Sequence, residues 1–141
     1  GRRDDKTAAN WYKRAAEQGV PEAQFQYALM LLDGKYVPKD TKEADALMEA
    51  AAEADNRLAQ FNLAQMMVDR NTGGLGISKA IDYYRRAAEA GLADAQYAMA
   101  QVYLNGVGGK PADFEEARKW MTLAARQNYD PAQLDLGTWL V

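Results

Sequence analysis

An Ala-Gln pair recurs along this chain at a nearly constant interval, and this repetition constrains the fold more than any other feature. The pairs are Ala23-Gln24, Ala59-Gln60, Ala95-Gln96 and Ala132-Gln133. Each pair is preceded by an Ala-Ala pair eight residues earlier and by a large apolar pair four residues before that. An interval of about 36 residues is typical of proteins built from stacked structural repeats. The sequence therefore predicts an array of four similar units.

Within each unit the apolar residues have the period of a helix. In the first unit they lie on one face at i, i+3, i+4, i+7 and i+8, at Ala8, Trp11, Tyr12, Ala15 and Ala16. In the third unit a second stripe follows after a short break, at Ala95, Met99, Val102 and Tyr103. No alternating strand pattern competes with these stripes. Each unit is predicted to be a helix-turn-helix hairpin in an all-α fold.

The breaks inside the hairpins hold residues that tolerate a left-handed backbone. Gly19 and Gly91 occupy the break in the first and third units, and Asn128 occupies it in the fourth. In the second unit Asp55 replaces the glycine, which puts the geometry of that turn in doubt. Pro21 and Pro131 follow the break, where a fixed φ suits the first turn of a helix.

Glycine-rich segments are expected to separate one hairpin from the next. They are residues 34–38, 73–76 and 106–111. Asp40 and Asp113 each have a glutamate three residues later, which predicts capping boxes at the starts of the following helices. Ser78 is the expected N-cap of the third unit. The units are then about 5–40, 41–77, 78–112 and 113–141 of one domain, 1–141.

Stacked hairpins would share one continuous core. Trp11, Tyr83 and Trp120 are expected to fill the gaps between hairpins, and all three tryptophans, including Trp139, are expected to be buried. The apolar end at Trp139 and Leu140 is expected to be covered by further repeats or by another molecule. The chain begins with Gly rather than Met, and a fragment of a longer protein is the expectation.

Composition narrows the classes of function. The 141 residues contain no His, no Cys and a single serine, and their formal net charge is −3. Nucleophile arrangements that need a histidine and zinc sites made of Cys and His are excluded. A mild acidic excess argues against a nucleic-acid binder, and no apolar stretch is long enough to span a membrane. The expectation is a non-enzyme without catalytic residues, metal or cofactor.

The repeated residues resemble the Sel1-like repeat family, whose units are slightly longer than those of the related tetratricopeptide repeats. The third unit matches the family pattern best, through Ala80, Tyr83-Tyr84, Ala87-Ala88-Glu89, Gly91, Ala95-Gln96, Met99, Tyr103, Gly106 and Gly108. The resemblance implies a right-handed α/α superhelical solenoid of four stacked repeats. It also implies an adaptor or scaffold that binds a protein or peptide partner, in bacterial signalling or in cell-envelope and polysaccharide processes. Periplasmic or exported proteins are common in this family, and a cytoplasmic one is possible.

In related solenoids the first helix of each hairpin lines the concave surface. The candidate partner-binding residues are those that face away from the apolar stripe of these helices: Asn10, Lys13, Arg14, Glu17, Glu49, Asp82, Arg85, Arg86, Glu89 and Lys119. The basic members are expected to meet acidic groups of a partner. The competing interpretation is a solvated helix face whose charges pair within the helix.

Two further alternatives stay open at this point. A carbohydrate or cell-wall fragment would bind by stacking on an exposed tryptophan or tyrosine in the groove, which buried tryptophans would exclude. The second alternative is a structural or self-associating role through the apolar C-terminal end. The glycine loop before Lys110 is not expected to bind phosphate. A phosphate-binding loop follows a strand and has Ser or Thr after its lysine, and this segment has neither feature.

Overall fold

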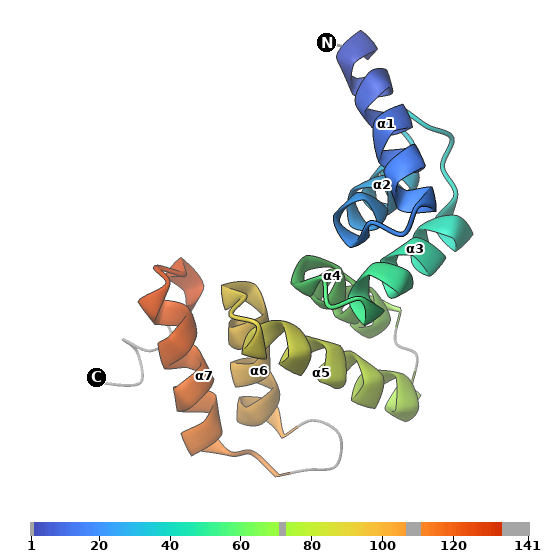
Figure 1. The fold of residues 1–141 in the computed structure, drawn as a ribbon. Helices are drawn as coiled ribbons and strands as arrows, with labels where there is room; N and C mark the ends of the chain where they lie inside the picture. Colours follow the sequence, from blue (N-terminus) through green and yellow to red (C-terminus); the bar gives the residue numbers. More distant parts are fainter. Residues whose placement is uncertain (1, 71–72, 107–110, 134–141) are drawn as a thin grey trace. The chain divides into compact units, whose positions relative to one another are not determined.

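The computed structural model describes residues 2–70, 73–106 and 111–133 (Figure 1). All regular secondary structure in these three ranges is helical. The chain divides into two compact units, Gly1–Leu63 and Ala64–Val141. The boundary between the units falls inside one helix.

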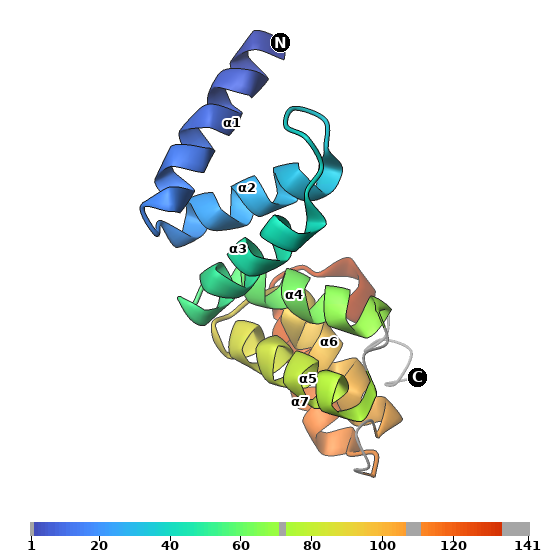
Figure 2. The same cartoon turned by 90° about the vertical axis from the view of Figure 1, so that its right-hand side faces the viewer.

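The first unit is built from consecutive helices that fold back on one another. They are α1 (Arg2–Glu17), α2 (Pro21–Asp33), α3 (Thr41–Glu53) and the first half of α4 (Arg57–Asp69). Pro21 opens α2 as predicted. Asp40 precedes α3, and its side chain accepts a hydrogen bond from the backbone N–H of Glu43 at 3.0 Å. The N-cap bond of the predicted capping box is confirmed, but the N–H of Asp40, which the box would pair with the Glu43 side chain, donates to the carbonyl of Leu31 at 3.1 Å. Residues 34–40, which include the expected connector 34–38, join α2 to α3 (Figure 2).

The second unit holds the rest of α4, followed by α5 (Gly73–Glu89), α6 (Ala93–Asn105) and α7 (Phe114–Arg126). Asp113 caps α7 by accepting from the N–H of Glu116 at 3.2 Å, as predicted. Its own N–H, which a capping box would pair with the Glu116 side chain, donates to the carbonyl of Tyr103 at 2.8 Å. Residues 130–133 are again helical. Most of the predicted connector 106–111, as well as Trp139 and Leu140, lies outside the described residues.

Two predictions about the start of α5 were wrong. Residues 73–76 were expected to form a connector, but they are the first turn of α5. Ser78 was expected to cap this helix, and it lies inside the helix instead. A glycine in a helix costs roughly 1 kcal/mol relative to alanine. That cost is small enough for an existing helix to extend through the segment, because each added residue contributes a further backbone hydrogen bond.

The tight turns inside the four hairpins share one backbone conformation. Gly19 and Gly91 have φ values of 85° and 95°, and Asp55 and Asn128 have values of 67° and 61°. All four residues are in the left-handed region, which glycine enters without strain and which Asp and Asn tolerate best among the others. The prediction for Gly19, Gly91 and Asn128 is confirmed. Asp55 adopts the same conformation despite its side chain, so the second turn keeps the common geometry.

The cores of both units consist largely of alanine. In the second, third and fourth units the first alanine of the stripe is buried, and so are the later stripe alanines Ala51, Ala52, Ala87, Ala88 and Ala124. The small side chain lets neighbouring helices approach closely, and larger residues such as Tyr83 and Trp120 fill the remaining space, with 2% and 8% of their surface exposed. Their predicted burial is confirmed. Trp11 was expected to be buried as well, and this is wrong, because 65% of its surface is exposed.

The glutamine of the Ala-Gln pair joins the two helices of a hairpin. The side-chain amides of Gln60, Gln96 and Gln133 donate to the backbone carbonyls of Ala52, Ala88 and Ala125, at 3.1, 3.2 and 3.1 Å. Each bond reaches back eight residues to the end of the preceding helix, where carbonyls lack a partner within the helix. The repeated glutamine therefore holds the turn closed.

Candidate partner-binding surfaces

In the first unit the structure brings four candidate residues together on one face of α1. Asn10, Lys13, Arg14 and Glu17 are all exposed and jointly line a shallow surface hollow of about 490 Å³. Their spacing of three, four and seven residues places them along a single stripe of the helix. The hollow offers two cations, a carboxylate and an amide. Glu49 is exposed on α3 and does not line this hollow.

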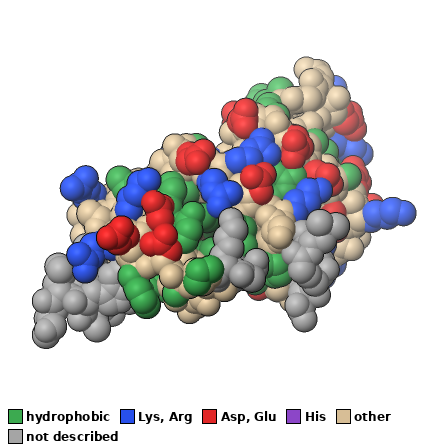
Figure 3. Space-filling view, turned by 90° about the horizontal axis from the view of Figure 1, so that it is seen from below, with side chains coloured by type: hydrophobic (Ala, Val, Ile, Leu, Met, Phe, Trp, Pro, Cys, Tyr) green, Lys and Arg blue, Asp and Glu red, His purple; other side chains and the backbone are tan. Residues whose placement is uncertain are grey.

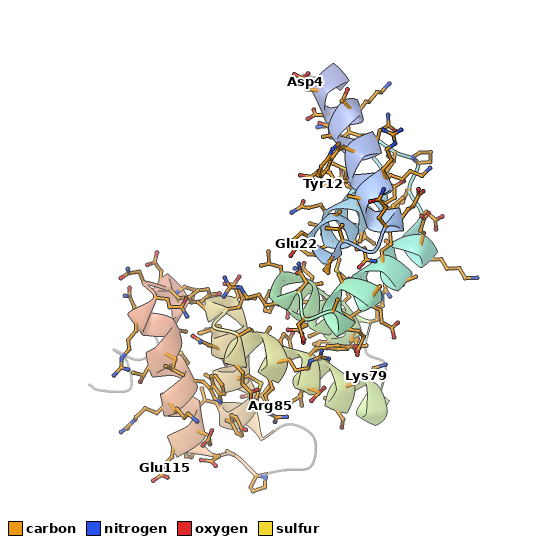
Figure 4. The ribbon with its side chains drawn as sticks, in the orientation of Figure 1. Asp4, Tyr12, Glu22, Lys79, Arg85 and Glu115 are labelled. Atoms are coloured by element: carbon orange, nitrogen blue, oxygen red, sulfur yellow. The ribbon has the colours of Figure 1, made fainter. Side chains whose placement is uncertain are left out.

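In the second unit a larger pocket of about 570 Å³ opens between α5, α6 and the start of α7. Arg85 is the candidate residue that lines it. The other lining residues are Ser78 and Ile81 from α5, Val102, Tyr103 and Gly106 from the end of α6, and Pro111, Ala112, Asp113, Phe114 and Glu115 from the start of α7. Figure 4 labels Arg85 on α5 and Glu115 at the start of α7.

A backbone hydrogen bond fixes the far wall of this pocket. The N–H of Asp113 donates to the carbonyl of Tyr103 at 2.8 Å, which ties the start of α7 to the last turn of α6. The Asp113 carboxylate is already engaged in capping α7. Phe114 follows directly and is 68% exposed, so a large apolar ring lies at the rim. A main-chain hydrogen bond thus joins two of the elements that line the pocket.

The pocket combines an apolar lining with one cation, that of Arg85, and with two carboxylates, those of Asp113 and Glu115. Ile81, Val102, Tyr103 and Phe114 supply the apolar surface, and among the described lining residues Arg85 alone carries a basic group. A guanidinium presents several N–H donors in a planar fork that fits a carboxylate. The pocket can therefore accept an apolar side chain and bind an acidic group beside it.

Two other predicted cations lie against aromatic rings of their own helices. The guanidinium of Arg86 is 5.5 Å from the centre of the Tyr83 ring, and the ammonium of Lys119 is 5.4 Å from that of Trp120. Such cation–π contacts favour one orientation of the cation. Asp82 and Glu89 are exposed on α5 and do not line the pocket.

Sequence reasoning missed most of the pocket. Tyr103 was assigned to the stripe of its helix, and Phe114 was not considered as a contact residue. One feature of the sequence could have pointed to Phe114. This apolar residue lies in the first turn of a helix, between Asp113 and Glu115, where solvent-exposed positions favour negative charge. Figure 3 shows hydrophobic side chains exposed among interspersed acidic and basic ones on one face of the molecule.

A tyrosine in the second unit has a strongly perturbed acidity. Burial, with a smaller contribution from the Asp69 carboxylate, raises the pKa of Tyr84 to about 12. The neutral hydroxyl donates to the side-chain oxygen of Gln65, which joins the second half of α4 to α5. Tyr84 therefore acts as a buried structural donor.

Neither a metal site nor a membrane-spanning helix is found among the described residues. They contain no group of three or more His, Cys, Asp or Glu side chains placed to hold a metal ion. Within the same residues, no helix has the length and apolar character that crossing a bilayer requires.

Comparison with known proteins assigns the repeats to a family. The model of the Sel1 repeat matches residues 1–20, 21–56, 57–92 and 93–129. Each complete match pairs the second helix of one hairpin with the first helix of the next. No curated protein matches the chain.

Two solved structures resemble the chain over most of its length. One is c5321, a protective antigen present in uropathogenic Escherichia coli strains displaying an SLR fold, with 34% identity and a TM-score of 0.83. The match covers 96% of this chain but only 29% of the antigen, so the chain spans less than a third of that protein. The other is a Sel1 repeat protein from Oxalobacter formigenes, with 30% identity and a TM-score of 0.82, covering 91% of this chain and 96% of that one.

The repeat match and both structures agree with the all-α arrangement of repeated helices described above. Proteins of this family are generally non-catalytic scaffolds that mediate protein interactions. The chain belongs to the Sel1 repeat family and has its all-α helical repeat fold.

Proposed function

We propose that this chain is a non-catalytic interaction module that binds a protein or peptide partner through the first helices of its repeats. The pocket beside Arg85 would receive an apolar side chain of the partner, and Arg85 would bind an acidic group next to it. A setting in bacterial signalling or at the cell envelope, including the periplasm, is part of this proposal and rests on the family resemblance alone.

The observation that carries the proposal is the position of Arg85. Its side chain is half-buried and lines a largely apolar pocket of about 570 Å³. A partly desolvated guanidinium gains more from a carboxylate than a fully solvated one, because the lower local dielectric strengthens the attraction. An apolar anchor followed or preceded by Asp or Glu is therefore the peptide chemistry that fits best.

The hollow on α1 is proposed as a second contact of the same partner class. Lys13 and Arg14 offer two cations there, with Asn10 available for hydrogen bonds. Surface cations of this kind contribute modestly to affinity and more to the rate of association. The competing interpretation, a solvated face with pairing inside the helix, predicts that reversing these charges leaves binding unchanged.

A selection from a random peptide library displayed on phage would test the pocket. The expected result is enrichment of peptides with an aromatic or branched aliphatic residue within two positions of Asp or Glu. Arg85→Glu should reduce the affinity of a selected peptide by at least about tenfold, because it removes the guanidinium and adds repulsion. Arg118→Glu is the matched control, since Arg118 is exposed on α7 outside the pocket.

Circular dichroism should first show that the Arg85→Glu and Arg118→Glu variants are both folded. The binding measurements then either support or remove the pocket as the peptide site. Equal binding by the Arg85→Glu variant, or a consensus without acidic residues, would remove the pocket from the proposal. A Lys13→Glu and Arg14→Glu double variant then measures the contribution of the hollow on its own.

Carbohydrate binding remains a second candidate because of one specific observation. Stacking on a sugar needs an exposed aromatic ring, and the indole of Trp11 is 65% exposed. Buried tryptophans would have excluded this alternative, and Trp11 leaves it open. Retention of cell-wall glycans by the intact chain, lost in a Trp11→Ala variant, would support it.

A further inference from the structure

The pocket of the second unit carries charges of both signs, and they come from different helices. Arg85 lies on α5, whereas Glu115 lies at the start of α7, two residues after Asp113. Helix α6 contacts both α5 and α7, and its residues Val102 and Tyr103 supply apolar lining. Figure 4 labels Arg85 and Glu115 on their separate helices. The pocket therefore has a basic wall, formed by Arg85, and an acidic wall, formed by Asp113 and Glu115.

The charges of the two walls are not paired with each other. Among the described residues, no ion pair joins Arg85 to Glu115 or to Asp113. Arg85 is half-buried and Glu115 is exposed. An ion pair inside the protein would already satisfy both charges, whereas separate charges remain open to two groups of a partner.

The two carboxylates of the acidic wall differ in their availability. The carboxylate of Asp113 accepts a hydrogen bond from the backbone N–H of Glu116 at 3.2 Å and thereby caps α7. The carboxylate of Glu115 makes no hydrogen bond or ion pair with any other described residue. Glu115 is therefore the carboxylate that a partner can meet.

We propose that the pocket selects a peptide segment of its partner in which an apolar residue stands between an acidic and a basic residue. The acidic residue contacts Arg85, the apolar side chain enters the pocket, and Lys or Arg contacts Glu115. This inference rests on the proposed function, in which the pocket binds an apolar side chain and an acidic group. It adds a second charge of opposite sign and the residue that recognises it.

Repulsion argues against a segment with acids on both sides of the apolar residue. Such a segment would satisfy Arg85 but would place a second negative charge beside Glu115. The formal net charge of the whole chain, −3, also disfavours a strongly acidic partner. Specificity depends on rejecting wrong partners as well as on binding the right one. A segment with one charge of each sign meets both walls with attraction.

The two walls should contribute differently to binding. Arg85 is half-buried, so its attraction for a carboxylate is less weakened by water than that of an exposed cation. Glu115 is exposed, and an exposed ion pair changes affinity by only a few fold. Arg85 is thus expected to supply most of the electrostatic affinity, and Glu115 the choice between partner segments.

Three versions of one peptide test this role of Glu115. A peptide whose binding depends on Arg85 is taken from the phage selection and synthesised with Lys, Gln or Glu on the side of its apolar residue away from the acid. By isothermal titration the Lys version should bind at least about threefold more tightly than the Glu version, with Gln between them. Glu115→Gln should reduce this ratio by at least about half, and Glu115→Lys should reverse the preference.

Glu22→Lys is the matched control for Glu115→Lys. Glu22 is the exposed second residue of α2, as Glu115 is the exposed second residue of α7, and Figure 4 labels both. The two changes therefore place lysine at the same position of a first helical turn, with a similar cost to the helix. Glu22 does not line the pocket, so its change should leave the ratio of affinities as it is in the unmodified chain. Circular dichroism checks that all variants are folded.

The inference and the proposed function fail in different ways. A ratio below about threefold with the unmodified chain, a ratio that Glu115→Gln leaves unchanged, or an equal effect of Glu22→Lys would overturn the inference. Continued sensitivity to Arg85→Glu would then leave the proposed function standing. If no selected peptide is sensitive to Arg85→Glu, the proposed function fails, and the inference falls with it.

Discussion

The side-chain amide of Gln127 donates to the side-chain oxygen of Gln96 at 2.9 Å and to the backbone carbonyl of Gly91 at 2.8 Å. Gln96 in turn donates to the carbonyl of Ala88 at 3.2 Å. These bonds run from the end of α7, through the buried start of α6, to the end of α5. The glutamine that marks the repeat in the sequence is therefore the centre of a small network linking successive repeats.

Replacing Gln96 with alanine should lower the free energy of unfolding by about 1–3 kcal/mol, because the buried hydrogen bond to the Ala88 carbonyl is lost and Gln127 loses one of its two acceptors. Gln127→Ala should cost less, about 0.5–1 kcal/mol, because Gln127 is exposed and water replaces its bonds. Urea unfolding followed by circular dichroism measures both values. Equal costs would contradict the central position of Gln96.

Stability should fall at alkaline pH in a way that depends on Tyr84. Its pKa is raised from an ordinary value of 10 to about 12, so the folded state favours the neutral phenol. The stabilisation is complete below pH 10 and is lost as the pH rises from 10 through 12. Tyr84→Phe should remove this part of the pH dependence. Chemical unfolding at a series of pH values measures it, and parallel curves for the two proteins would refute the assignment.

Two tryptophans in equivalent positions should respond differently to truncation. Trp120→Ala should lower the free energy of unfolding by about 3–5 kcal/mol, because it empties a buried site. Trp11→Ala should change it by no more than about 0.5 kcal/mol, since most of the indole is in solvent. Thermal and urea unfolding of both variants provide the comparison. A large cost at Trp11 would mean that its ring is covered in solution.

Two glycines with positive φ should differ in their tolerance of alanine. Gly19 has a φ of +85° and open space around an added Cβ, so Gly19→Ala should cost about 1–2 kcal/mol through backbone strain alone. At Gly34, with a φ of +72°, the added Cβ would lie 2.8 Å from the Cβ of Lys39. Gly34→Ala should therefore cost more than Gly19→Ala in urea unfolding. The reverse order would show that the connector moves freely.

Partner binding should be nearly independent of pH between about 6 and 8, because the chain has no histidine and no other unperturbed side chain titrates there. Binding should weaken as salt is added, because exposed charges are screened. Isothermal titration of a selected peptide that itself lacks histidine checks both effects. A steep change in affinity within this pH window would contradict the proposed interaction between guanidinium and carboxylate.

Local features of this protein were predictable because each depends on a few neighbouring residues. Asp40 and Asp113 cap their helices through a backbone N–H three residues later. Gly19, Gly91 and Asn128 adopt the left-handed conformation that ends a helix. Hydrophobic periodicity likewise indicated an all-α repeat fold. The start of α5 was mispredicted because a local preference of glycine, worth about 1 kcal/mol per residue, is overridden by helix extension.

The sequence by itself determined the repeat, the helices and the turns, whereas tertiary structure decided which stripe residues are buried and where the candidate surfaces lie. Trp11 and Trp120 have equivalent positions in the pattern, yet only Trp120 is buried, because α6 packs against its helix. Arg85 faces a pocket where the end of α6 and the start of α7 are joined by the hydrogen bond from the N–H of Asp113 to the carbonyl of Tyr103. Helix periodicity assigns a residue to a face, but exposure depends on which other helix covers that face.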